Sequence, residues 1–180
     1  MDKTLVEKTL SRERLFSGKI INVERWEVEL PNGKLAQREV VLHPGAAAVV
    51  AIDEQGNVAL VEQYRCALGA LKLEIPAGKL DAGEEPMLCA ARELQEETGY
   101  IAENLEFLTA MDSAPGFCSE QVSIYLARGL RRGEMHLDED EFLMVSFVPM
   151  EQVLQQIMSG SLNDAKSVCG ILMAARILGY

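Results

Sequence analysis

The sequence has no apolar run long enough to cross a bilayer, and the segment MDKTLVEKTLSRERLF is too charged for a secretory signal peptide. These two absences lead us to expect a cytoplasmic protein. Basic residues are also scarce, because 17 lysines and arginines stand against 28 aspartates and glutamates, giving a net charge of −11. No basic cluster offsets that charge, so the composition argues against binding to nucleic acid or to an anionic membrane surface.

Cysteine is rare as well, and its spacing excludes the common zinc motifs. The four cysteines form no CxxC pair, which disfavours a zinc site and predicts free thiols in a reducing compartment; they are Cys66, Cys89, Cys118 and Cys169. A small anionic partner of so acidic a chain would need a mediating cation, and a metal ion is the obvious candidate.

The 180 residues suit one domain with a small extension. Residues 1–18 are polar and weakly patterned, and two alternating segments around Asn32-Gly33 predict a β hairpin over 19–43. His43-Pro44-Gly45 then marks a boundary between an N-terminal β subdomain, 1–43, and a larger domain, 44–180. In the larger domain the patterns predict strands near 46–52, 58–65, 71–76, 104–112, 121–128 and 142–148, and helices near 86–98, 150–158 and 164–178. Because these strands and helices do not alternate regularly, we expect an α/β fold with a mixed sheet.

The predicted helix 86–98 carries three glutamates within RELQEET, namely Glu93, Glu96 and Glu97. At helical spacing they form an arc beside an expected core stripe of Met87, Ala90, Ala91 and Leu94. Carboxylates that repel one another near the negative end of a helix dipole are unfavourable. Clustered carboxylate oxygens suit a hard divalent cation such as magnesium, so the arc predicts a metal site.

The surrounding segment GKLDAGEEPMLCAARELQEETGY, residues 78–100, resembles a complete Nudix box. All fixed positions of that pattern match, and they are Gly78, Glu84, Arg92, Glu93, Leu94, Glu96, Glu97, Gly99 and Tyr100. A pattern with nine constraints over 23 residues is highly specific.

The resemblance implies an α/β/α sandwich with a mixed sheet and magnesium-dependent hydrolysis of a nucleoside diphosphate linked to another moiety, with manganese as an alternative ion. It implies that Glu93 and Glu97 bind the metal with help from Glu96 and from the backbone carbonyl of Ala77. It gives a structural role to Gly78, Glu84, Arg92 and Gly99. An ion pair between Glu84 and Arg92 would hold the loop and the helix together.

Features outside the box bear on the substrate. Pro115 follows Tyr100 by 15 residues, a distance that marks the ADP-ribose pyrophosphatase branch of the family. Five other segments also resemble bacterial members of that branch: the hairpin segment, VEQYR, EIPAG, LDEDEF and DAKSVCGILMAARIL. The resemblance therefore implies hydrolysis of ADP-ribose to AMP and ribose 5-phosphate. The alternatives are another ADP-sugar, a nucleotide sugar or a dinucleotide; a domain that binds without cleaving is disfavoured, because such proteins typically lose box glutamates.

The same resemblance suggests further site residues and a partner. A glutamate of the loop HLDEDEF would be the general base, with Glu139 slightly preferred over Glu141. Adenine contacts would come from Trp26 and Glu27, and diphosphate contacts from Arg65 and Arg38. Glu120 would lie near the terminal ribose or the metals. Because an isolated hairpin is only marginally stable, the N-terminal strands are expected to be exchanged between the two subunits of a homodimer.

Overall fold

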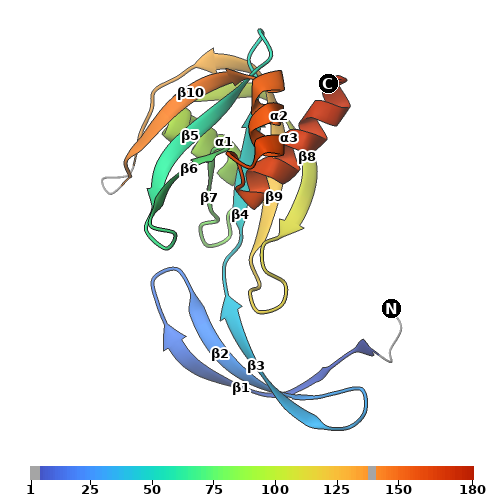
Figure 1. Cartoon of the computed structure of the whole chain (residues 1–180). Coiled ribbons are helices and arrows are strands. Elements are labelled where there is room, and N and C mark those ends of the chain that lie inside the picture. Colours follow the sequence, from blue (N-terminus) through green and yellow to red (C-terminus); the bar gives the residue numbers. More distant parts are fainter. Residues whose placement is uncertain (1–4, 138–140) are drawn as a thin grey trace. The chain divides into compact units, whose positions relative to one another are not determined.

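The computed structural model describes residues 5–137 and 141–180, and the chain divides into two compact units (Figure 1). Unit 1 contains residues up to Gly45 together with the segment Asp112–Glu120, and unit 2 contains Ala46–Met111 and Gln121–Tyr180. The N-terminal unit therefore includes a segment that the sequence places far downstream of it.

Unit 1 is built on a three-stranded antiparallel sheet in the order β1-β2-β3. Strands β2, Asn22–Glu29, and β3, Leu35–Leu42, form the expected hairpin, and residue Asn22 pairs with Leu42 at its open end. In the connecting turn Gly33 has φ of 80°, a conformation that glycine adopts at little cost. The prediction of an N-terminal hairpin is confirmed.

Strand β1, Lys8–Ser17, was not expected, because residues 1–18 have no clear pattern. It pairs with β2 along its length, with Arg12 opposite Trp26. Every residue of β1 is exposed in this single chain, so neither of its faces is buried. Without a buried face a strand need not alternate apolar and polar residues, and this explains why the sequence pattern missed it.

The segment Asp112–Glu120 belongs to unit 1 because it is hydrogen-bonded to the end of β3. The Val41 amide donates to the Phe117 carbonyl at 2.7 Å, and the Ser119 amide donates to the Val41 carbonyl at 2.9 Å. The His43 amide also donates to Ser119 Oγ at 3.0 Å. Unit 1 thus closes only with residues from the middle of the chain.

Unit 2 contains a mixed sheet and an antiparallel sheet. The mixed sheet has the order β7-β4-β9-β8, with β4 and β9 parallel, and its strands are β4 (Ala46–Ala51), β7 (Ala77–Lys79), β8 (Tyr100–Asp112) and β9 (Gln121–Arg132). The antiparallel sheet has the order β10-β5-β6, and its strands are β5 (Asn57–Arg65), β6 (Ala70–Glu74) and β10 (Leu143–Pro149). The helices are α1 (Pro86–Thr98), α2 (Met150–Ser159) and α3 (Ala165–Leu178).

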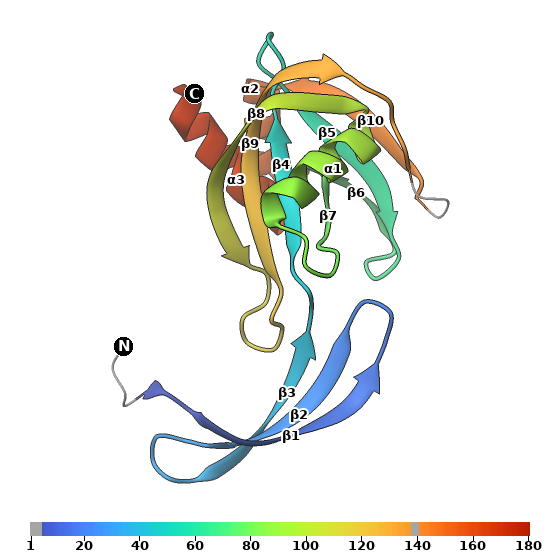
Figure 2. The ribbon, with the colours of Figure 1, turned by 180° about the vertical axis from the view of Figure 1, so that it is seen from behind.

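The side chains of β4 alternate between two separate apolar clusters. Ala48 and Val50 belong to the cluster that contains α2 and α3, whereas Ala47 and Val49 belong to the cluster that contains α1. Successive side chains of a strand point to opposite faces, so the helices cover both faces of the sheet (Figure 2). This confirms the expected α/β/α sandwich. None of the helices in the described part of the chain has the length and apolar character needed to cross a membrane.

The core stripe of α1 differs from the expected one. Met87 is 48% exposed and Ala91 is also exposed, whereas the residues buried on α1 are Cys89, Ala90, Glu93, Leu94, Glu97 and Thr98. The buried set has helical spacing too, but it includes two of the glutamates. The expectation that the glutamates only border the core was wrong for these two, because a pattern of apolar residues alone does not register buried acids.

Candidate active site

Helix α1 has the ends that its sequence predicts. Pro86 occupies the first turn of the helix, where a backbone amide would have no intrahelical acceptor, so the lack of an amide hydrogen costs no hydrogen bond. Gly99 ends the helix with φ of 73° and donates its amide to the Gln95 carbonyl, and strand β8 begins at the next residue. The segment before the helix begins with the short strand β7, in which Ala77 pairs with Ala48 of β4. These contacts fix the carboxylates of α1 beside the backbone of β7.

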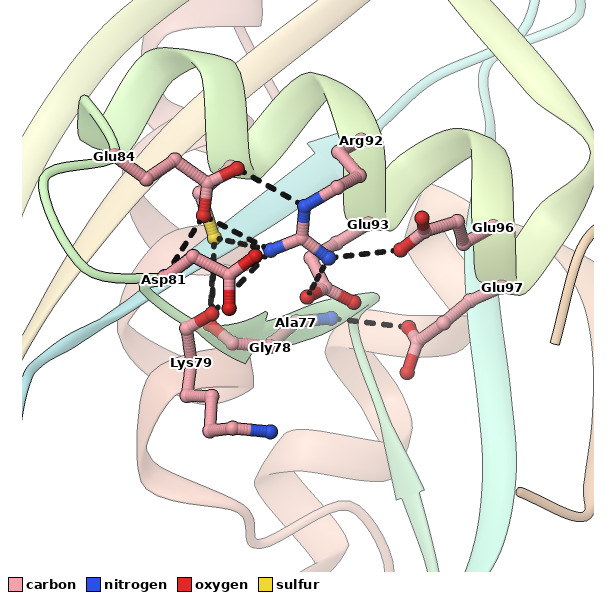
Figure 3. Close-up of polar contacts among 10 residues, drawn as sticks. Ala77, Gly78, Lys79, Asp81, Glu84, Arg92, Glu93, Glu96 and Glu97 are labelled. Atoms are coloured by element: carbon pink, nitrogen blue, oxygen red, sulfur yellow. Dashed lines mark hydrogen bonds and ion pairs between the residues drawn. The ribbon is translucent and has the colours of Figure 1, made fainter. Parts of the chain in front are cut away.

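Arg92 is the central cation of this region (Figure 3). Its Nε and Nη2 donate to the two Glu84 carboxylate oxygens at 2.9 and 3.0 Å, and Nη1 donates to Glu93 at 2.7 Å and to Glu96 at 2.8 Å. The hydrogen bonds from Arg92 lower the pKa of Glu84 to about 2, with a further contribution from the Asp81 amide. Arg92 therefore joins the loop to the helix, and it also contacts two of the expected metal ligands.

Gly78 leaves the space that Glu93 occupies. A Cβ atom at Gly78 would lie 1.9 Å from Glu93 Oε1, and therefore any side chain there would displace the carboxylate. The backbone angle at Gly78 is not one that favours glycine. Glycine is needed here because the Glu93 carboxylate occupies the space of a Cβ atom.

Glu97 is the most deeply buried of the acidic residues on α1, with 2% of its surface exposed. It accepts a hydrogen bond from the Ala77 amide at 3.0 Å. Burial raises the pKa of Glu97 to about 8; the Ala77 amide opposes this effect, and the charges of Glu93 and Glu141 add to it. Burial also raises the pKa of Glu93, although the adjacent Arg92 opposes the rise.

These carboxylates fit a divalent cation. Two buried carboxyl groups that are costly to ionise, set beside the backbone of β7, are stabilised by a hard cation that prefers oxygen ligands. Among residues 5–137 and 141–180, however, no three acidic, histidine or cysteine side chains converge into a ready cluster. The arrangement in this structure has Arg92 between Glu93 and Glu96, where it holds one oxygen of each.

A polar hollow of about 220 Å³ opens beside these groups. It is lined by Gly78, Lys79, Asp81, Arg92, Glu93, Glu96 and Glu141. Of the two candidate bases, Glu141 thus lies at the hollow, and its charge contributes to the raised pKa values of Glu93 and Glu97. Glu139 lies outside the described residues.

Arg65, expected to contact the diphosphate, is instead paired with a buried glutamate. Its Nε and Nη2 donate to both oxygens of Glu74 at 2.8 and 2.7 Å, and Glu74 is 3% exposed. Lys166 of α3 donates to the same carboxylate at 2.5 Å and to Asp164 at 3.0 Å. Burial alone would raise the pKa of Glu74, but the hydrogen bonds from Arg65 and the charge of Lys166 outweigh it and lower the pKa to about 2.

This ion-pair network adjoins the backbone that leads to the site. Asp164 caps α3 by accepting from the Ser167 amide and hydroxyl, and Ser167 Oγ accepts from the Ile75 amide at 2.8 Å. Ile75 lies two residues before Ala77. Sequence reasoning missed the network, since neither Glu74 nor Lys166 belongs to a motif with a stated role, although Asp164 three residues before Ser167 is a readable helix-cap signal.

The expected substrate residues of unit 1 separate into two groups. Trp26 and Arg38 are directly paired on β2 and β3, and both line a hollow of about 410 Å³ together with Pro115 and Ser119. The guanidinium of Arg12 lies 4.1 Å from the centre of the Trp26 ring, and the indole nitrogen donates to the Glu24 carboxylate at 2.7 Å.

Glu27 and Glu120 do not line that hollow. Glu27 follows Trp26 on β2 and therefore points to the other face of the sheet. The Glu120 carboxylate lies 3.5 Å from Nδ1 of His43. The structure thus brings together Trp26 and Arg38 but not these two glutamates.

Comparison with known proteins agrees with the box and with the N-terminal strands. Residues 41–168 match the model of the NUDIX domain, and residues 7–41 match that of the nucleoside diphosphate sugar hydrolase N-terminal domain. The chain is 47% identical to an ADP-ribose pyrophosphatase of Bacillus subtilis, covering 94% of this chain and 92% of that protein. It is 43% identical to a methanol dehydrogenase activator of Bacillus methanolicus, covering 95% and 94%.

A solved structure extends the likeness to three dimensions. The crystal structure of an ADP compounds hydrolase aligns over 99% of this chain and 97% of that one, with a TM-score of 0.87 and 26% identity. The family match covers more than half of the chain and includes the whole box, residues 78–100. The chain therefore belongs to the Nudix hydrolase family.

Proposed function

We propose that this protein hydrolyses the diphosphate bond of ADP-ribose to give AMP and ribose 5-phosphate, with Mg²⁺ or Mn²⁺ as cofactor. The observation that carries the proposal is the 47% identity to an ADP-ribose pyrophosphatase over 94% of the chain. The three box glutamates are present, Glu93 and Glu97 are buried, and Glu93 lines a polar hollow, which supports cleavage over mere binding.

The metal would be held by Glu93, Glu96 and Glu97 and by the carbonyl of Ala77. When bound, it polarises the diphosphate and neutralises the charge that develops on it. Its presence at Glu93 and Glu96 would compete with Arg92, which has Glu84 as a further carboxylate partner and can stay in place through that ion pair. Arg92 would then keep the loop and the helix together while its other two contacts are given up.

The chain would also supply the base. A water oxygen forms a bond to one phosphorus, the bridging P–O bond breaks, and the proton of the water passes to a carboxylate. The position of Glu141 at the hollow supports it as that carboxylate, and Glu139, two residues earlier in the chain, is the alternative. Replacing each with glutamine separately should lower kcat strongly for one of them and leave substrate affinity nearly unchanged. Near-normal turnover in both variants would rule out this loop as the source of the base.

The adenine would bind at the hollow of unit 1. Trp26 offers an aromatic ring there, and its indole hydrogen bond to Glu24 and its contact with Arg12 hold the ring in one orientation. Base stacking on such a ring is worth about 1–3 kcal/mol. Pro115, the residue that suggested this branch of the family, lines the same hollow, which supports the assignment.

We further propose a homodimer with exchanged N-terminal strands, located in the cytoplasm. Strand β1 exposes Leu10, Leu15 and Phe16 to 44%, 42% and 54%, an apolar surface that a second subunit would cover. The four cysteines are free, which fits a reducing compartment. Sedimentation of the full chain and of a chain lacking residues 1–42 tests the dimer. A truncated chain that remains dimeric and active would contradict the exchange.

One assay tests the substrate. AMP release is measured from ADP-ribose, ADP-glucose, NADH and diadenosine polyphosphates, each with and without magnesium. ADP-ribose should rank among the best by kcat/KM, and only with the metal. The panel also covers dinucleotides, the alternative class of substrate, so a preference for NADH or a diadenosine polyphosphate would replace the proposal with that class.

A further inference from the structure

The polar hollow carries far more negative than positive charge. Four of its lining residues are acidic, namely Asp81, Glu93, Glu96 and Glu141, and two are basic, Lys79 and Arg92. A diphosphate substrate is itself an anion, and a metal ion on the carboxylates neutralises only part of the combined charge. Binding of the diphosphate therefore needs a cationic donor of the chain that is available to phosphate oxygens.

Arg92 is not free, because protein acceptors occupy all three nitrogens of its guanidinium. Nε donates to Glu84, Nη1 donates to Glu93 and Glu96, and Nη2 donates to Glu84 and to the carbonyl of Lys79. Even where a metal ion takes Glu93 and Glu96 from Nη1, Nε and Nη2 stay bound to Glu84 and to the Lys79 carbonyl, so the guanidinium remains directed at the loop.

Arg65 is not a lining residue of the hollow, and two of its three guanidinium nitrogens are bound to Glu74. The partner of that pair is nearly inaccessible to water, so exchanging it for a substrate oxygen would leave a buried charge with less compensation. Arg65 is thus poorly placed to serve as the mobile phosphate contact.

Lys79 differs from both arginines, because its backbone is fixed while its ammonium group has no ion-pair partner among the described residues. It pairs with Ala46 in the β7–β4 ladder, and its carbonyl accepts from Arg92 at 3.3 Å. In Figure 3 no contact reaches its amino nitrogen, and within the described residues no carboxylate forms an ion pair with it. Lys79 lines the hollow, and none of the residues in 5–137 and 141–180 is shown to engage the three donors of its ammonium.

We propose that Lys79 is a substrate-binding residue that donates to a non-bridging oxygen of the diphosphate. The inference rests on the proposed function only in requiring a diphosphate substrate, because the contact involves neither the adenine nor the terminal ribose. A lysine serves this purpose as a compact charge on a flexible stem, and the rigid strand β7 sets where that stem begins.

The test uses full-length Lys79→Met and Lys79→Arg proteins, with Lys34→Met in the exposed hairpin turn as a matched control. The probes are the α,β-methylene analogue of ADP-ribose and imidodiphosphate, each titrated calorimetrically at saturating Mg²⁺. Lys79→Met should bind both probes about 10-fold more weakly, equivalent to roughly 1.4 kcal/mol. Lys79→Arg should restore most of the affinity, and Lys34→Met should match the wild type.

Mn²⁺ binding without nucleotide, followed by electron paramagnetic resonance, separates a phosphate contact from a structural defect. Lys79→Met should bind Mn²⁺ at least as tightly as the wild type, since it removes a positive charge near the ligands. Unchanged affinity for both phosphate probes, or an equal loss of Mn²⁺ affinity, would overturn the inference. Imidodiphosphate contains no nucleoside, so its result holds even if ADP-ribose proves to be the wrong substrate.

Discussion

Replacing Glu74 with glutamine removes the only carboxylate shared by Arg65 and Lys166 in the described part of the chain. The amide has nearly the shape of the carboxylate, so the change removes charge without creating a cavity. Lys166, with 13% of its side chain exposed, retains Asp164, whereas Arg65, 41% exposed, can turn partly to water. The variant should therefore fold, but with a lower free energy of unfolding.

The pKa of Glu74 sets the expected loss. The folded pKa of about 2 lies below the ordinary value of 4.5, so the ionised group stabilises the fold above pH 4.5. That stabilisation is lost as the pH falls from 4.5 through about 2. At roughly 1.4 kcal/mol per pKa unit, the lowering corresponds to about 3 kcal/mol at pH 7. This agrees with the roughly 3–5 kcal/mol found when one partner of a buried ion pair is removed.

Urea unfolding of the wild type and of Glu74→Gln, measured between pH 7 and pH 3, tests this reasoning. The difference in unfolding free energy should be about 3 kcal/mol at pH 7 and fall to about half of that at pH 3. Glu54→Gln, in the exposed turn after β4, is the control and should change stability by less than about 0.5 kcal/mol. A loss below about 1 kcal/mol at pH 7, or one that does not depend on pH, would show that the network does not stabilise the fold as argued.

Three further predictions concern the site and its supports. Gly78→Ala should lower kcat/KM by about 100-fold with the circular dichroism spectrum unchanged, because the new methyl group displaces the Glu93 carboxylate; activity within threefold of the wild type would contradict this. Asp164→Ala should lower the free energy of unfolding in urea by about 1 kcal/mol or more through loss of the α3 cap, and a smaller change would show that the cap contributes little. Trp26→Ala should raise KM for ADP-ribose by about 10-fold while Trp26→Phe raises it less, and equal KM values in all three proteins would remove adenine stacking from the proposal.

Much of the fold followed from local signals in the sequence. Pro86 and Gly99 marked both ends of α1, and Asn32-Gly33 marked the hairpin, because these residues favour particular backbone conformations whatever surrounds them. The box pattern also predicted the ion pair between Glu84 and Arg92, which joins the loop to the helix that carries the three glutamates.

The features that the sequence did not predict depend on contacts between distant residues. The burial of Glu97 is set by β7 and the sheet, and the pairing of Arg65 with Glu74 and Lys166 requires β5, β6 and α3 to be in place. An arginine beside a site is read from sequence as a phosphate contact, because its ion-pair partner becomes apparent only after folding. Strand β1 was missed for a different reason. In a single chain it has no buried face, so its sequence need not alternate apolar and polar residues.

The hydrogen bonds between β3 and the segment Asp112–Glu120 also constrain the order in which the chain can fold during synthesis. Val41 leaves the ribosome long before its partners Phe117 and Ser119. At about 5–20 residues per second, the N-terminal sheet waits roughly 4–16 s for them. During that interval β3 lacks these partners. Helix α1 with its glutamates is synthesised before the partners emerge. Unit 1 is therefore first in sequence, yet it cannot be completed before a large part of unit 2 has emerged.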